Sequence, residues 1–220
     1  MGRGVFISFE GGDGVGKTTQ VELLTNWLED QGLSVRRTRE PGATALGAQL
    51  RSLLLGTASE NAQRTQITAK AEALLFAADR AQHVNELINP ALAAGQVVVT
   101  DRYIDSSVAY QGAARCLGAK DVRDLSMWAT DNLLPDLTML LDADPQLAAK
   151  RVHTRSGKSD AIEAEGLQFQ YHLREQFHRL AEQESARIKI IDASVEIEQI
   201  AAQVRALVSE LLKERGIIDA

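Results

Sequence analysis

The sequence of 220 residues has little of several features that mark other classes of protein. Its single cysteine, Cys116, excludes a disulfide within the chain and a cysteine cage for a metal, and is compatible with a reducing compartment. No stretch approaches the roughly 20 consecutive apolar residues of a membrane helix, and the first residues do not read as a secretory signal. We therefore expect a cytoplasmic protein without a membrane partner.

Positive charge is also scarce in this chain. There are 24 lysines and arginines against 30 acidic residues, which gives a formal net charge of -6. The chain thus lacks the general basic field that holds proteins on nucleic acid polymers or anionic membranes. An anionic ligand would instead be bound locally, by backbone amides and a few arginines, which suits a small phosphorylated molecule.

Linkers and repeats are missing too, since the chain has only four prolines and no tract rich in glycine and serine. What it does contain is a regular alternation of short β-branched runs and longer helical patterns. The runs lie at residues 5–9, 34–36, 97–100, 137–141 and 188–191, and the main helical patterns at 18–31, 70–94, 121–132, 145–153, 167–186 and 196–215. This alternation predicts an α/β fold, a five-stranded parallel sheet with helices on both faces, in a single domain over residues 1–220.

The most specific motif follows the first predicted strand. Residues 11–18 fit the pattern G-x-x-x-x-G-K-[ST] and lead directly into a helical pattern. In such a phosphate loop, backbone N–H groups and the helix N-terminus hold nucleotide phosphates, the lysine reaches the β and γ phosphates, and the hydroxyl coordinates Mg²⁺. The residues expected to bind ATP are Gly11, Gly12, Asp13, Gly14, Val15, Gly16, Lys17, Thr18 and Thr19. The fold is therefore expected to be a three-layer P-loop NTPase, but the motif alone does not separate a kinase from a GTPase or a motor.

Asp101 and Arg102 directly follow the third predicted strand, at the edge of an open α/β sheet where ligands bind. Asp101 is a candidate to support Mg²⁺ together with Thr18, and Arg102 to hold a phosphate through paired hydrogen bonds. The alternative is that the two residues only cap the next helix and form a surface pair.

Three further segments carry side chains suited to binding a phosphoryl acceptor. The hydroxyl, amide and aromatic groups of residues 105–112 suit hydrogen bonding and stacking on a base, or else form a solvated helix face. Residues 39–42 place charges before a turn at the same sheet edge, where an ordinary surface turn is the alternative. Phe76 and Arg80 share a helix face at spacing i,i+4 and are suited to grip a base and its phosphate, unless Phe76 is core and Arg80 is solvated.

Together, these segments resemble bacterial thymidylate kinase. The likeness rests on residues 9–19, 38–42, 75–80 and 101–112, and it extends over nearly the whole chain. It implies ATP-dependent phosphorylation of dTMP to dTDP with Mg²⁺, by a homodimer. The dTMP site that it implies consists of Asp13, Glu40, Arg51, Phe76, Arg80, Arg102, Ser107, Tyr110 and Gln111.

The likeness also implies a role for most of these residues. Arg80 and Arg102 would hold the dTMP phosphate, with Arg51 and Glu40 nearby. Phe76 would stack on thymine, and Ser107 and Gln111 would hydrogen-bond to the edge of the base. Asp13 would contact the sugar 3′-hydroxyl.

A lid over ATP at about residues 151–163 is a further implication of the resemblance. A short polar turn separates two helical patterns there, and Arg151, Arg155 and Lys158 are the candidate cations, with Arg151 expected to contact ATP. An ordinary exposed basic loop is the alternative, and Ala161 stands where the family usually carries arginine. The residues expected to act in catalysis are Lys17, Asp101, Arg102 and Arg155.

Three other functions are compatible with the sequence. One is a kinase for another nucleoside monophosphate, which would share the phosphate loop and the arginines. Another is a P-loop ATPase switch, which hydrolyses ATP without an acceptor and assembles on a partner. A third is a nucleotide-binding regulator with little turnover, which Ala161 would suit.

Overall fold

Five parallel strands form the centre of the fold. The computed structural model describes residues 3–56, 67–156 and 166–219, with the side chains of residues 154–156 outside the description. The strands are β1 (Val5–Glu10), β2 (Val35–Arg39), β3 (Val97–Asp101), β4 (Leu137–Asp142) and β5 (Ile188–Asp192), in the order β2-β3-β1-β4-β5. Every neighbouring pair is parallel, so the predicted fold class is confirmed.

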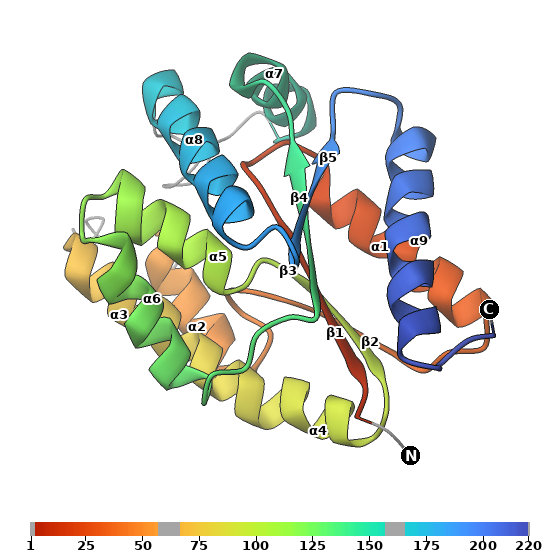
Figure 1. The fold of residues 1–220 in the computed structure, drawn as a ribbon. Coiled ribbons are helices and arrows are strands. Elements are labelled where there is room, and N and C mark those ends of the chain that lie inside the picture. The colour runs from red at the N-terminus through yellow and green to blue at the C-terminus, as the bar shows by residue number, and fades with distance from the viewer. Residues whose placement is uncertain (1–2, 57–66, 157–165, 220) are drawn as a thin grey trace.

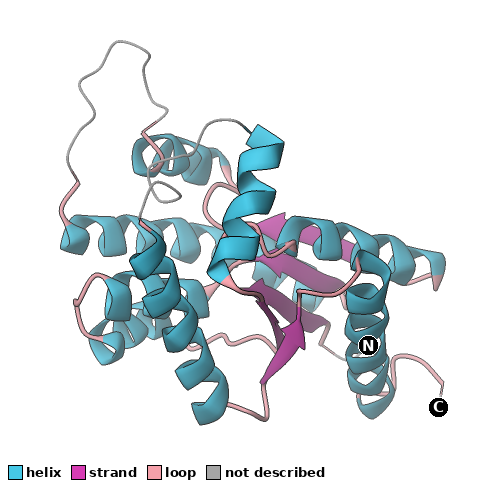
Figure 2. Ribbon diagram, turned by 90° about the horizontal axis from the view of Figure 1, so that it is seen from above, coloured by secondary structure: helices cyan, strands magenta, loops and turns pink. Residues whose placement is uncertain are grey.

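Helices cover both faces of this sheet (Figures 1 and 2). The helices are α1 (Lys17–Asp30), α2 (Ala45–Leu54), α3 (Ala69–His83), α4 (Asn89–Ala93), α5 (Ile104–Ser107), α6 (Ala119–Ala129), α7 (Pro145–Ser156), α8 (Leu167–Gln183) and α9 (Ile197–Glu214). Alternate β1 side chains point to opposite faces, so Val5 and Ile7 pack in one apolar cluster with α1 and α9. Phe6 packs in the other cluster, with α4 and α8.

Two segments are wound as π-helices, which the sequence did not predict. The predicted helix at residues 70–94 is α3, η1 (Val84–Ile88) and α4 in succession. Pro90 lies just after η1, and because proline lacks an N–H and its ring crowds the preceding turn, a wider turn accommodates it. The second π-helix, η2 (Val108–Ala114), follows α5. It brings the polar segment at residues 105–112 into the interior, so the alternative of a solvated helix face is wrong.

Strand β2 continues three residues beyond the run expected at residues 34–36. The added residues Arg37, Thr38 and Arg39 did not read as a strand because two of them are charged. Since β2 lies at one edge of the sheet, its arginine side chains reach the outside and remain solvated.

All five strands end at the same edge of the sheet, where the phosphate loop at residues 11–16 leads from β1 into α1. At Gly14, φ is +82°, and a Cβ atom there would lie 2.3 Å from the carbonyl oxygen of Ala148 in α7. The loop can therefore approach α7 this closely only with glycine at that position. Parallel strands thus bring the loops after β1, β2 and β3 together at one edge.

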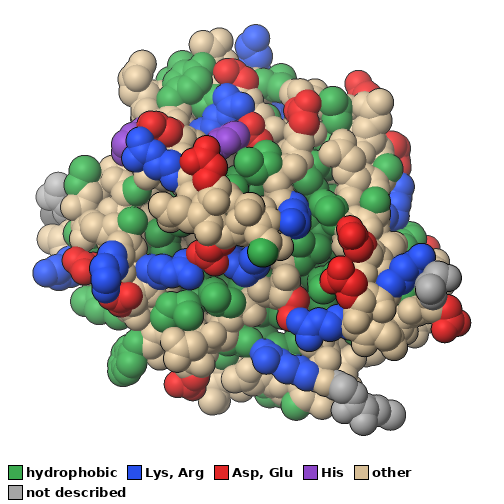
Figure 3. All heavy atoms as spheres, in the orientation of Figure 1, with side chains coloured by type: hydrophobic (Ala, Val, Ile, Leu, Met, Phe, Trp, Pro, Cys, Tyr) green, Lys and Arg blue, Asp and Glu red, His purple; other side chains and the backbone are tan. Residues whose placement is uncertain are grey.

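The outer surface carries charges of both signs. Figure 3 shows acidic and basic side chains interspersed over the face that Figure 1 presents. Within the described ranges, no helix has both the length and the apolar character needed to cross a membrane.

Candidate active site

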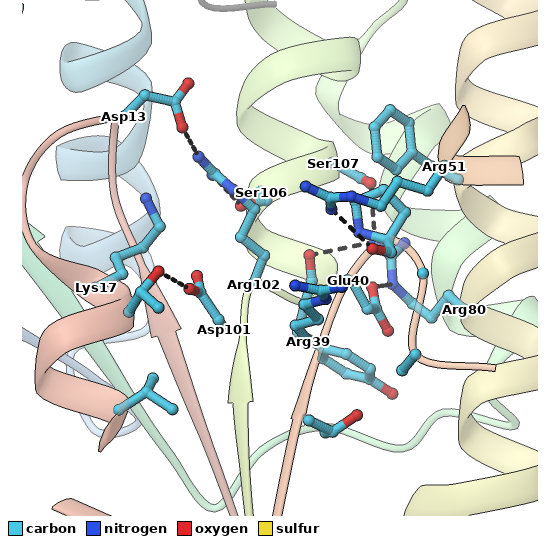
Figure 4. Close-up of a pocket in the computed structure, with 18 of the residues that line it drawn as sticks. Asp13, Lys17, Arg39, Glu40, Arg51, Arg80, Asp101, Arg102, Ser106 and Ser107 are labelled. Atoms are coloured by element: carbon cyan, nitrogen blue, oxygen red, sulfur yellow. Dashed lines mark hydrogen bonds and ion pairs between the residues drawn. The ribbon is translucent and has the colours of Figure 1, made fainter. Parts of the chain in front are cut away.

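A cavity of about 770 Å³ lies at this edge of the sheet, within the size range of pockets for small molecules. The predicted site residues that line it are Asp13, Gly14, Gly16, Lys17, Thr18, Thr19, Glu40, Arg51, Phe76, Arg80, Asp101, Arg102, Ser107, Tyr110 and Gln111. In Figure 4, Lys17 and Asp13 lie on the side of the phosphate loop, and Arg51 and Arg80 lie opposite them. The residues predicted to bind ATP and those predicted to bind the acceptor therefore share one continuous space.

Lys17 begins α1, and its side chain is buried under the phosphate loop. Its Nζ donates to the carbonyl oxygens of Gly11 and Gly12, at 3.0 and 2.7 Å. Burial, followed by the nearby charge of Arg102, lowers the pKa of the Lys17 ammonium to about 8. Gly11 and Gly12 do not line the cavity, and neither does Val15, whose side chain belongs to the apolar core. Gly11 and Gly12 thus act through their backbone, whereas the Val15 side chain anchors the loop in the core.

Thr18 and Asp101, the two predicted Mg²⁺ ligands, are in direct contact. The Thr18 hydroxyl donates to Asp101 Oδ2 at 2.7 Å. Across the described part of the chain, no group of three or more acidic, histidine or cysteine side chains forms a metal cage. Two neighbouring oxygen donors without such a cage fit Mg²⁺, which keeps several waters and takes further ligands from phosphates.

Arg102 projects into the cavity from a backbone in the left-handed region, with φ of 72°. Its guanidinium donates to Ser106 Oγ at 2.9 Å and to the Tyr110 hydroxyl at 3.3 Å, and it forms an ion pair with Asp13. Burial acts to raise the pKa of Asp13, but the charges of Arg102 and Lys17 outweigh it and hold that pKa below its usual value. The ion pair between Arg102 and Asp13 thus lies between the phosphate loop and α5.

Glu10 holds the segment after Arg102 in place, a role that the sequence did not assign. Its carboxylate accepts from the Tyr103 backbone N–H at 2.8 Å and from the Ser106 hydroxyl at 2.5 Å. Burial, followed by the charge of Asp105, raises the pKa of Glu10 to about 8. The only sequence signal for this residue was an acid at the end of a predicted strand.

Arg80 is 1% exposed, so the alternative of a solvated side chain is wrong. Its guanidinium donates to Glu40 Oε2 at 2.8 Å, to the hydroxyls of Ser126 and Ser107, and to the carbonyl oxygen of Tyr103. These four bonds leave one of the five guanidinium N–H groups for a ligand. His83 Nδ1 lies 2.9 Å from Glu40 Oε1 and fixes that carboxylate from the other side.

Three arginines of β2, namely Arg36, Arg37 and Arg39, also line the cavity. Arg39 belongs to the charged segment at residues 39–42 that the sequence singled out, whereas Arg36 and Arg37 were absent from the prediction. The signal that could have found them is the repeated arginine in a short strand that ends at the ligand edge. Charge of one sign gathered there offers an anionic ligand extra attraction.

The predicted lid is only partly described. Arg151 of α7 does not line the cavity, and its Nη1 donates to the carbonyl oxygen of Ala193 at 2.8 Å. The Arg155 side chain and Lys158 lie outside the described residues. The lid therefore stays a prediction from the sequence.

Comparison with known proteins gives the family. A profile described as thymidylate kinase matches residues 9–204. The chain belongs to the thymidylate kinase family. The thymidylate kinase of Bifidobacterium longum strain DJO10A is 53% identical over 208 residues, which cover 94% of this chain and 98% of that protein. The thymidylate kinase of Clavibacter sepedonicus is 51% identical over 203 residues, which cover 92% and 93% of the two chains.

A solved structure agrees with this assignment. The crystal structure of thymidylate kinase from Ehrlichia chaffeensis superimposes with a TM-score of 0.72 at 29% identity, and the match covers 94% of this chain and 99% of that one. The resemblance noted in the sequence is thus confirmed, and the chain is an enzyme that phosphorylates dTMP to dTDP.

Proposed function

We propose that the cavity holds the phosphates of ATP and dTMP side by side, so that the γ-phosphoryl group passes in line from one to the other. The observation that supports this is the shared cavity, in which Lys17 of the phosphate loop and Arg102 after β3 line the same space. Phosphoryl transfer is catalysed mainly by positioning and by neutralising charge, so a cavity with cations at both ends suits the reaction.

On the donor side, the phosphate loop and the N-terminus of α1 bind the ATP phosphates. The Lys17 ammonium leaves the two loop carbonyls and bonds the β and γ phosphates, where its charge is needed. Thr18 and Asp101 supply oxygen ligands for Mg²⁺ or its waters. When bound, Mg²⁺ neutralises part of the phosphate charge.

On the acceptor side, Arg102 carries most of the attraction for the dTMP phosphate, since its side chain is 18% exposed against 2% for Arg80. Each guanidinium makes four bonds within the chain and keeps one N–H group for a ligand. Arg51 of α2, which also donates to the Pro41 carbonyl at 2.9 Å, faces the same space. The remaining roles are stacking by Phe76, reading of the base edge by Ser107 and Gln111, and sugar contacts by Asp13 and Tyr110. No general base is needed, because a phosphate monoester is mostly ionised at neutral pH.

Several wider expectations stand as proposals beside this one. They are one domain over residues 1–220, a lid at about residues 151–163 that brings Arg155 to the γ-phosphate, a cytoplasmic location, and a homodimer. Exposed apolar side chains on neighbouring helices support the homodimer, with Leu74 of α3 53% exposed and Trp128 of α6 81% exposed.

The acceptor is tested by ADP formation from Mg–ATP with each nucleoside monophosphate in turn, beside a control without acceptor. We expect dTMP to give the highest kcat/KM, by at least about tenfold, because a hydrogen-bonding base site rejects bases that leave its polar groups unpaired. Equal rates with another monophosphate would show a broader acceptor range. ADP formation that does not depend on the acceptor would contradict transfer within the shared cavity.

The pKa of Lys17 gives a second test. Below about pH 8 the ammonium is charged, and above it the free enzyme loses that charge. We expect kcat/KM for Mg–ATP to fall as pH rises above about 8, approaching tenfold per pH unit, whereas kcat stays level to higher pH because bound phosphates retain the proton. Initial rates from pH 7 to 10 measure this. The Lys17→Arg variant, whose guanidinium stays charged, should lose the fall, and a level wild-type profile to pH 10 would contradict the lowered pKa of Lys17 in the free enzyme.

A further inference from the structure

The Gln111 side chain of η2 is held by Glu72, which is in turn held by Arg115. Neither the sequence motifs nor the proposed reaction gave these two residues a role. The Gln111 side chain is buried, with 2% of the residue exposed, and its Nε2 donates to Glu72 Oε1 at 2.8 Å. Glu72 lies in the first turn of α3. Arg115, just after η2, donates from Nε to the same Glu72 oxygen, also at 2.8 Å. Two segments that are distant in the sequence, the first turn of α3 and the end of η2, thus meet at a single carboxylate oxygen.

This shared oxygen determines which way the Gln111 amide faces. Arg115 has only donors, so Glu72 Oε1 is an acceptor at this point. An amide turned the other way would set its own oxygen against that acceptor, with no proton between them. The amide nitrogen therefore has to face Glu72, and Gln111 keeps one N–H and its Oε1 for other partners.

Arg115 is itself positioned by α8. Its guanidinium carbon lies 5.9 Å from the centre of the Phe169 ring, within the range of a cation–π contact. The Glu72 and Arg115 side chains are 12% and 24% exposed, so they are largely withdrawn from water, which strengthens the ion pair between them. The support behind Gln111 is thus ordered on both sides.

The remaining N–H and Oε1 of Gln111 form a donor–acceptor pair of fixed orientation. Thymine presents an acceptor at O4 beside a donor at N3–H, which is the complement of such a pair. Cytosine presents a donor at the 4-amino group beside an acceptor at N3, which is the reverse. An amide free to turn would serve either base, and an amide held by Glu72 serves only one.

We propose that Glu72, supported by Arg115, is a specificity-determining positioning residue that selects thymine over cytosine by fixing the orientation of the Gln111 amide. This inference rests on the proposed role of Gln111 in reading the base. It adds that the discrimination between thymine and cytosine depends on Glu72, which holds Gln111 from the side away from the base.

The test uses the Glu72→Leu variant with dTMP, dUMP and dCMP. Leucine is of similar size but offers no acceptor, and the Arg115 guanidinium can then donate to the Gln111 oxygen, so Gln111 can turn either way. We expect the ratio of kcat/KM for dTMP to that for dCMP to fall at least about tenfold, because cytosine no longer meets mispaired polar groups. Uracil has the same N3–H and O4 as thymine, so the ratio of dTMP to dUMP should stay within about threefold of wild type. A loosened pocket would move both ratios.

Glu86→Leu is the matched control. Glu86 in η1 accepts from the Gln82 amide at 2.7 Å and is exposed, so this variant also removes a carboxylate that faces a glutamine, but away from the cavity. Both ratios should match wild type. Arg115→Gln leaves the Glu72 carboxylate as an acceptor but removes the donor that holds it in place. This variant should lower the ratio of dTMP to dCMP in the same direction but by less, and it serves if Glu72→Leu does not fold.

The outcomes separate the two proposals. An unchanged ratio of dTMP to dCMP in Glu72→Leu, with a lowered ratio in Gln111→Ala, would overturn the role of Glu72 and keep Gln111 as the reader. An unchanged ratio in both variants would overturn the base-reading role as well. If wild type accepted dCMP as readily as dTMP, there would be no discrimination to explain, and both would fail.

Discussion

Replacing Lys17 by methionine is expected to lower kcat about a thousandfold while the chain remains folded. The side chain is 7% exposed and lies where a cation can reach the transferring phosphoryl group, so its charge acts in a poorly solvated place. Methionine has a similar length, and burial already disfavours the ammonium, whose pKa is lowered to about 8. The fold should thus tolerate the change. Steady-state rates with saturating Mg–ATP and dTMP, beside thermal unfolding, measure both parts.

Lys189→Met is the matched control for this variant. Lys189 of β5 also donates to a backbone carbonyl, that of Ser185 at 2.7 Å, but it does not line the cavity. Its replacement should leave kcat within about twofold of wild type. If Lys17→Met kept more than a tenth of the wild-type kcat, the proposed role of the phosphate-loop lysine would be lost.

Replacing Arg102 by methionine is expected to lower kcat/KM for dTMP about a thousandfold, with KM for ATP changed by less than about threefold. The variant removes a guanidinium whose charge-assisted bonds to a phosphate are worth several kcal/mol when desolvated. It also leaves the Asp13 carboxylate without its ion pair, and this uncompensated negative charge would repel an incoming phosphate. Both effects act on the acceptor.

Arg102→Lys and Arg179→Met give the comparison for this prediction. Lysine keeps the charge but not the planar fork, so part of the loss should be recovered. Arg179 of α8 forms an exposed pair with Glu175 at 2.7 Å, and its loss should have no effect on either substrate. A parallel rise in KM for ATP in Arg102→Met would place Arg102 with the donor and contradict the proposed division of the cavity.

The parts of the site that the sequence predicted are those carried by contiguous residues. The phosphate loop and the pair Asp101 and Arg102 each follow a hydrophobic run, and parallel strands bring the ends of such runs to one edge. Position along the strand pattern was therefore enough to place Lys17 and Thr18 near Asp101. The hydrogen bond of 2.7 Å from the Thr18 hydroxyl to Asp101 Oδ2 agrees with that expectation.

The parts that the sequence did not predict depend on contacts between distant residues. Glu10 and Ser106 are 96 residues apart, and Gln111 and Glu72 are 39 apart, so no local pattern marks either pair. Two arginines of β2, Arg36 and Arg37, were missed for another reason. A strand at the edge of a sheet need not alternate apolar and polar side chains, so these arginines did not mark a strand that reaches the ligand edge.

The π-helix η2 has a consequence for how the acceptor pocket can change in evolution. A π turn closes its hydrogen-bonded ring with one residue more than an α turn, so it depends on chain length as well as on side chains. Tyr110 and Gln111 both lie in η2, and so their directions depend on how many residues separate α5 from Gly118. Relatives with the same number of residues here can exchange these two side chains singly. A relative that is one residue shorter has to present a different pair to its substrate.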